Sequence, residues 1–109
     1  MRLRHGDKVV NLTAHTVRIW TRHGVNRAYS LSGGVARVVE RRANTGRSVN
    51  GAPLYTVELH VEGMPDPGRC VWFIVTDAVR RALPERQDVI TPVDFVSARG
   101  HYRGFVSNA

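Results

Sequence analysis

Val71-Trp72-Phe73-Ile74-Val75 is the longest unbroken apolar run in the chain, and it leads directly into Thr76-Asp77-Ala78-Val79-Arg80-Arg81-Ala82-Leu83-Pro84. A short, continuous apolar run is typical of a strand that is covered on both faces. The residues after it carry helical spacing as far as the proline. The sequence therefore predicts that Val71 to Val75 is the middle strand of the core and that one short helix follows it.

This helix is predicted to begin at Thr76 or Asp77, either of which can cap it, and to end before Pro84. An apolar stripe at positions i, i+4, i+7 and i+8 is formed by Val75, Val79, Ala82 and Leu83. A helix of about two turns is unstable alone in water. We therefore expect it to dock on the sheet.

Strand patterns occupy most of the remaining chain. Two short alternating stretches lie between Lys8 and Thr21, and Leu54 to Val61 alternates most clearly. The alternation in this last strand predicts one solvent-exposed face and one face that packs on the core. The core face is expected to carry Tyr55, Val57, Leu59 and Val61. Asn50-Gly51 is the strongest hairpin dipeptide, so Ala43 to Ala52 is expected to be a loose arginine-bearing loop or a hairpin tip.

These patterns together predict an α+β, mainly β fold, with a single antiparallel curled sheet and one short helix packed on it. Extended pieces on either side of Pro92 and a last strand from Tyr102 to Val106 are expected to complete the sheet. A length of 109 residues is typical of one domain, covering 1–109. Cys70 is the single cysteine, which excludes an intrachain disulfide, and we expect it at the edge of the core.

The composition is that of an ordinary globular protein, with 42% hydrophobic and 23% charged residues. A membrane span needs about twenty apolar residues, and no apolar segment follows the charged amino terminus as it would in a secretory signal. We therefore expect no membrane association and a location in the cytoplasm of a cell.

Charge is the unusual feature of the composition. Lysine and arginine number 16 against 9 acidic residues, a net charge of +7, and Lys8 is the single lysine. Residues 1–50 hold ten basic and two acidic groups, whereas residues 51–109 hold six and seven. Arginine forks suit phosphates and carboxylates, so the first half is expected to face an anionic partner, either nucleic acid or an acidic protein or nucleoprotein surface.

Seven arginines are the candidates for such an anion-binding surface: Arg18, Arg22, Arg27, Arg37, Arg41, Arg42 and Arg47. Trp20 and Tyr29 lie close to the first three in sequence and could stack on bases. The two groups of arginines form one basic surface if their strands are neighbours in the sheet. The alternative is a solvated face that keeps the protein soluble.

Several segments resemble a small uncharacterised family seen in actinobacteria and their phages. They are Asn11-Leu12-Thr13-Ala14-His15, Gly34-Val35-Ala36-Arg37-Val38, Gly63-Met64-Pro65-Asp66-Pro67, and Ile74 to Val89, so the resemblance spans Asn11 to about Pro92. The family usually has proline at the position of Ala14 and serine at that of Thr76, and its members are often less basic. The resemblance implies a phage or mobile-element context and no established activity.

Asn11, Thr13 and His15 form the candidate ligand site, because one short stretch offers amide, hydroxyl and imidazole groups. The alternative is a structural kink, in which the first two side chains bond to the backbone. Glu58, His60 and Glu62 share a strand face and could hold a cation, but a solvated polar face explains them equally.

No catalytic motif is present. The chain lacks the Gly-x-Ser-x-Gly elbow, its five histidines are scattered, and Ser32-Gly33-Gly34 is a turn without the lysine of a phosphate loop. We therefore expect no catalytic residues, no metal and no cofactor.

Three functions follow from these observations. The first is a non-catalytic phage or mobile-element accessory protein whose arginines bind nucleic acid or a host nucleoprotein or defence complex. The second is a virion structural component, such as a capsid decoration or minor protein, held by sheet edges and apolar contacts. The third is a small nucleotide-binding protein or enzyme that uses the candidate ligand site. Self-association into a homo-oligomer is open in each case.

Overall fold

The structure, a computed structural model, describes residues 7–21, 24 and 26–109. It is mainly β. The elements within these residues are β1 (Lys8–Asn11), β2 (Val17–Trp20), β3 (Asn26–Tyr29), β4 (Arg37–Val49), β5 (Ala52–Glu62), β6 (Val71–Ile74), α1 (Asp77–Ala82), β7 (Val89–Val93) and β8 (Gly104–Ser107). They form a four-stranded sheet in the order β1-β6-β7-β8 and two two-stranded sheets, β2-β3 and β4-β5.

The central sheet is mixed, so the prediction of a single antiparallel sheet is wrong, whereas a mainly β fold is confirmed. Strands β1 and β7 both pair with β6 in parallel, and β8 pairs with β7 antiparallel. Parallel neighbours need a crossover connection, which α1 supplies between β6 and β7. The sequence prediction failed here because parallel pairing leaves no turn dipeptide in the sequence.

The strand β6 lies inside the central sheet and is covered on both faces, as predicted. On one face, Phe73 and the adjoining Val75 pack with Val79 of α1. On the other face, Trp72 and Ile74 pack with β2. Residues of this second cluster are Val17, Ile19, Trp72, Ile74 and Ile90. The central sheet is therefore sandwiched between α1 and the β2-β3 sheet.

The helix boundaries agree with the sequence prediction. Thr76 is the N-cap, and its hydroxyl accepts a hydrogen bond from the Val79 amide at 3.4 Å. Leu83 is the C-cap, directly before Pro84. The side chain of Val79 is fully buried. The short helix thus owes its stability to its docking on the sheet.

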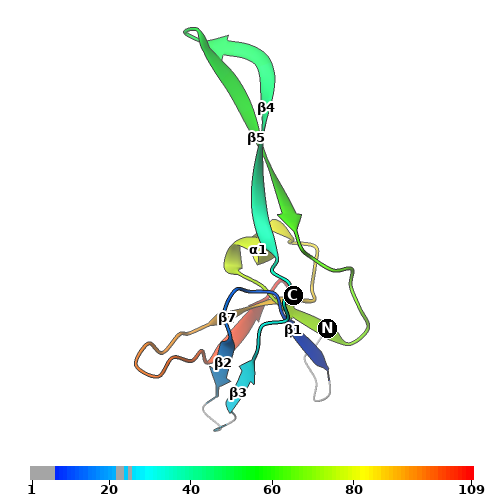
Figure 1. Ribbon diagram of the computed structural model, residues 1–109, viewed down its shortest axis with the longest axis vertical. Coiled ribbons are helices and arrows are strands. Elements are labelled where there is room, and N and C mark those ends of the chain that lie inside the picture. Colours follow the sequence, from blue (N-terminus) through cyan, green and yellow to red (C-terminus); the bar gives the residue numbers. More distant parts are fainter. Residues whose placement is uncertain (1–6, 22–23, 25) are drawn as a thin grey trace.

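Strands β4 and β5 form a long hairpin, hereafter the arm, that projects away from the rest of the molecule, hereafter the body (Figure 1). The molecule measures 61 × 35 × 26 Å and has a radius of gyration of 17.6 Å, whereas a compact chain of this size has about 13 Å. The arm turns at Asn50 and Gly51, with φ of +49° and +82°, as a two-residue hairpin turn requires. The hairpin predicted at this dipeptide is confirmed.

The surroundings of the arm were predicted incorrectly. Tyr55, Val57 and Leu59 are exposed, and of the apolar face of β5 it is Val61 that packs against the core. Of the two alternatives for Ala43 to Ala52, the hairpin tip is confirmed and the loose loop is wrong, because both strands continue to the turn with a register shift between Asn44 and Ser48. Alternation shows which side chains share a face, but it does not show whether that face is covered.

Two smaller predictions also need correction. Cys70 is exposed and has a φ of +55°, so it is not part of the core edge. Strand β7 runs through Pro92, whereas the sequence predicts that this proline separates two extended pieces. The proline is tolerated on the side of β6 because the pairing with β6 ends at Ile90, before the missing amide proton of Pro92.

Gly63 fixes the base of the arm and gives a test of the fold. Its φ is +82°, and a Cβ there would lie 2.3 Å from the carbonyl oxygen of Val35. Gly51 has the same φ, but a Cβ there would contact nothing within 4 Å. Both alanine substitutions impose about 1–2 kcal/mol of left-handed strain, and Gly63→Ala adds overpacking of about 2 kcal/mol.

We therefore expect Gly63→Ala to lower the free energy of unfolding clearly more than Gly51→Ala, as measured by urea denaturation. Equal losses for the two variants would show that the close approach of Gly63 to Val35 does not exist.

Candidate nucleic-acid interface

The arginines singled out in the sequence lie in two separate places. Arg18 and Arg27 belong to β2 and β3, whereas Arg37, Arg41, Arg42 and Arg47 all belong to β4 of the arm. The arm and the β2-β3 sheet lie at opposite ends of the molecule (Figure 1). Arg22 lies outside the described residues. The structure therefore does not bring the two groups into one sheet.

Part of the positive charge on the arm is balanced locally. Arg37 and Arg41 both reach Glu62, at 3.4 and 3.8 Å. On the same face, His60 lies 3.4 Å from Glu58. All of these side chains are well exposed, so the ion pairs contribute little stability. They do make this face of the arm a mixed surface and not a cationic one.

The end of the body that lies away from the arm has two further arginines, because a segment from the second half of the chain pairs with β2. The Trp20 amide donates to the Tyr102 carbonyl at 2.9 Å, and the Tyr102 amide donates to the Arg18 carbonyl at 2.8 Å. This pairing brings Arg99 and Arg103 beside β2. Arg18, Arg27, Arg99 and Arg103 are all exposed, and none forms an ion pair with another described residue.

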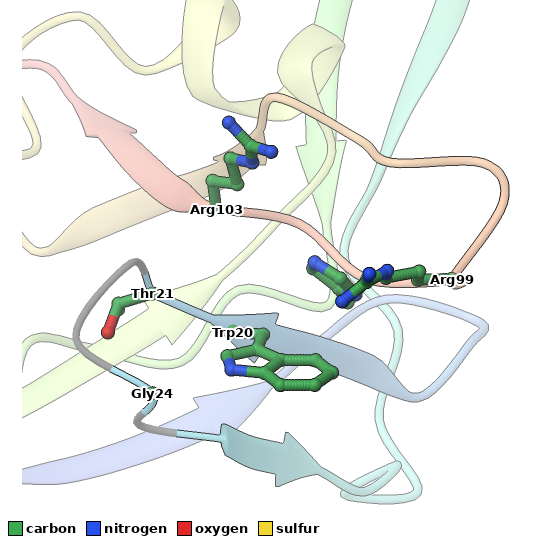
Figure 2. Close-up of a pocket in the computed structure, with 6 residues that line it drawn as sticks. Trp20, Thr21, Gly24, Arg99 and Arg103 are labelled. Carbon is green, nitrogen blue, oxygen red and sulfur yellow. The ribbon is translucent and has the colours of Figure 1, made fainter.

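Two of these four residues, Arg99 and Arg103, line a cavity of about 280 Å³, hereafter the basic-aromatic pocket (Figure 2). Its lining consists of Trp20, Thr21, Gly24, Arg99, His101 and Arg103. The guanidinium carbon of Arg99 lies 5.5 Å from the centre of the Trp20 ring, within cation–π range. The ring of His101 lies 5.2 Å from that indole at 49°. The indole thus has a cation and a second ring beside it and is still 39% exposed.

A second cavity, of about 210 Å³, adjoins the first and shares Thr21 and Arg103 with it. Arg27 and Tyr29 line this cavity together with apolar side chains. The aromatic residues that the sequence placed near the first arginine group, Trp20 and Tyr29, therefore both border cavities of the same end of the body. Arg103 lines both cavities, so each of them contains at least two arginines.

Sequence reasoning missed Arg99, His101 and Arg103. They belong to the half of the chain whose net charge is −1, so the count by halves directed attention away from them. The signal that could have found them is the compact run Arg99-Gly100-His101-Tyr102-Arg103, which holds two arginines and two aromatic rings within five residues. Its pairing with β2 leaves no trace in the sequence.

At the end of β1, the side chain of Asn11 is 2% exposed and fully hydrogen-bonded. Its amide nitrogen donates to the carbonyls of His15 and Tyr29, at 2.8 and 2.9 Å. Its carbonyl oxygen accepts from the Thr13 amide and hydroxyl, at 2.9 and 2.7 Å. Asn11 therefore ties the loop after β1 to the end of β3 and keeps no group free for a ligand.

The other two members of the candidate ligand site border a third cavity, of about 230 Å³. Thr13 and the exposed His15 line it with Thr76, Thr91 and mainly apolar neighbours. This cavity lies at the carboxyl ends of the parallel strands, where open α/β sheets commonly bind ligands. A ligand in this cavity would contact Thr13 and His15, and not the amide of Asn11.

Among residues 7–21, 24 and 26–109, no cluster of three or more histidine, cysteine, aspartate or glutamate side chains has the arrangement of a metal site. In the same residues, no helix has the length and apolar character needed to cross a membrane.

Comparison with known protein families, curated proteins and solved structures gives no match. A function can therefore be inferred only from the cavities and surfaces described above.

Proposed function

We propose that the protein is a non-catalytic accessory protein, in the phage or mobile-element context that its resemblance implies, and that it binds single-stranded nucleic acid. The observation that carries this proposal is the exposed side chain of Trp20, with Arg99 and His101 beside it, in a pocket that Arg103 also lines. Neither arginine forms an ion pair with another described residue.

The chemistry of this pocket fits a nucleotide chain. Every base has a π-face that can stack on an exposed aromatic ring, and one such contact is worth about 1–3 kcal/mol. Arg99 and Arg103 line the pocket together with Trp20, Arg18 lies two residues before Trp20 on β2, and Arg27 lines the adjoining cavity. These arginines can bond the phosphates on both sides of a stacked base.

The pocket favours a single strand over a duplex. The bases of a duplex are already stacked on one another, and duplex readout usually places a helix or a two-stranded ribbon in the major groove. At about 280 Å³ the pocket is of the size that receives one small group. Binding of this kind tolerates many sequences, because stacking and phosphate contacts are available to every nucleotide.

The salt dependence of binding tests this proposal. For a single strand, log K falls with log salt concentration with a slope of about −0.7 per phosphate contacted, so four arginines predict a slope of about −3. The measurement is fluorescence anisotropy of labelled single- and double-stranded DNA and RNA with nuclease-treated protein. We expect the single strands to bind more tightly than the duplexes.

An absence of binding even at low salt would contradict the proposal. The positive charge would then solvate the protein or face an acidic protein surface, and affinity capture from a host lysate would be the next experiment.

The arm favours a second candidate function, that of a virion structural component. Long exposed strands with unpaired edges are suited to contacts with other protein chains in a particle. Recovery of the protein from purified particles would support this function, and its complete absence from them would exclude it.

A further inference from the structure

The outer part of the arm has no packing partner in the monomer. From Glu40 to Leu59 every residue is exposed, whereas Val38 and Val61 at the base pack against the core. An isolated two-stranded ribbon is marginally stable at best in water and needs a further strand or a packed face. The outer part of the arm therefore needs a packing partner, and another protein chain can provide it.

The two faces of the arm differ in chemistry. The pairing register places Arg37, Arg41, Glu58 and Glu62 on one face, where their ion pairs form within the arm. The opposite face carries Tyr55, Val57 and Leu59, hereafter the apolar stripe, with exposed fractions of 48%, 54% and 61%. Three large apolar side chains in a row on an exposed surface are typical of an interaction site.

Beside the apolar stripe, β4 carries two opposite charges. Glu40 is paired in register with Leu59, and Arg42 is paired with Val57. Glu40 and Arg42 thus lie on the stripe face, two residues apart, and neither has an ion pair with the described part of the chain. A partner for this face must offer an apolar row and, next to it, a cation opposite Glu40 and an anion opposite Arg42.

We propose that this partner is a second copy of the chain. The stripe faces of two copies can pack against each other around a two-fold axis. This axis runs between the two stripe faces, perpendicular to the strands, and passes midway between the Glu40–Leu59 and Arg42–Val57 pairs, so that the surface is self-complementary. Glu40 then faces Arg42 of the partner subunit and Leu59 faces Val57 of the partner subunit. Such an isologous interface satisfies both charges and covers the apolar stripes at once.

The protein is thus a homodimer joined by its arms, with the basic-aromatic pockets at the far ends of the two bodies. The two pockets of one dimer can bind one long strand together, which raises the avidity without any new contact.

A charge exchange tests this inference, with the mass in solution measured by analytical ultracentrifugation over a range of concentrations. We expect the wild-type protein to have twice the mass of the chain. Like charges face each other across the two-fold axis in both Glu40→Arg and Arg42→Glu, so each is expected to weaken dimerisation about tenfold or more. The double variant E40R/R42E exchanges the charges and is expected to restore the dimer.

Two further variants separate the interface from the fold of the arm. Val57→Asp places a charge in the apolar stripe and is expected to abolish dimerisation, whereas Thr56→Asp places it on the opposite face of the same strand and is expected to leave the dimer intact. A wild-type chain that is monomeric at every concentration would overturn the inference. So would a double variant that dimerises no better than the single variants, because only a second copy can supply the exchanged charge. Neither outcome bears on the proposed pocket, because a short labelled strand reports its binding in monomer and dimer alike.

Discussion

Trp20→Ala is expected to weaken the binding of short single-stranded oligonucleotides about five- to a hundredfold, which corresponds to the loss of one stacked base. The fold should tolerate the change, because Trp20 lies at the end of β2 and is 39% exposed. The hydrogen bond from its backbone amide to Tyr102 does not depend on the side chain. Fluorescence anisotropy at fixed low salt gives the affinity, and the urea midpoint shows that the variant is folded.

Trp20→Phe and two arginine variants make this test specific. Phenylalanine keeps a ring for stacking, so Trp20→Phe should retain part of the affinity lost by alanine. Arg99→Ala removes the cation beside the indole and should weaken binding and make the salt slope shallower by about 0.7. Arg69→Ala removes the same charge from an exposed site just before β6 that does not line the pocket, and should change binding little. Equal effects of the two arginine variants would mean that general charge, and not the pocket, binds the strand.

The second large effect concerns stability. Asn11→Ala leaves the part-buried carbonyl of Tyr29 and the amide of Thr13 without the Asn11 side chain, whereas the carbonyl of His15 keeps its hydrogen bond from the Thr13 hydroxyl. Each buried polar group left unsatisfied costs about 1–3 kcal/mol, so we expect the free energy of unfolding to fall by about 3 kcal/mol or more. Asn11→Asp is expected to cost more, because it turns a carboxylate oxygen toward two carbonyl oxygens. Urea denaturation measures both losses.

An asparagine of the arm provides the matched control. Asn44 is exposed, and its side chain accepts one hydrogen bond, from the Gly46 amide at 2.9 Å. Asn44→Ala is therefore expected to cost no more than about 1 kcal/mol. If Asn11→Ala were no more harmful than Asn44→Ala, then Asn11 would not tie β1 to β3, and its side chain would again be open to a ligand.

The elements that the sequence predicted well are those defined by local chemistry. The five-residue run from Val71 contained the middle strand because it is apolar on both faces, and Thr76 and Pro84 set the ends of the helix through capping and the lost amide. Asn50-Gly51 placed the arm's turn because few dipeptides accept positive φ at both positions. In each case a stretch of no more than five consecutive residues holds the signal.

What the sequence could not predict depends on contacts between distant segments. The parallel pairing of β1 and β7 with β6 depends on a crossover, and the exposure of β5 depends on the absence of a covering layer over the arm. The candidate site shows the same division. Trp20 and Arg27, which line the two adjoining cavities, were singled out from local charge and aromatic content, whereas Arg99 and Arg103 reach the pocket through the pairing of Tyr102 with β2.

The most direct test of nucleic-acid binding at the pocket is the fluorescence of Trp20 during titration with a single-stranded oligonucleotide. Trp20 and Trp72 are the two tryptophans of the chain, and Trp72 is 3% exposed. A base that quenches by stacking can therefore reach Trp20 but not Trp72. We predict that the oligonucleotide quenches the emission in step with the binding seen by anisotropy, and that an abasic strand of equal length quenches far less. Unchanged emission while the strand is bound would contradict stacking at Trp20 and would move the nucleic acid away from the basic-aromatic pocket.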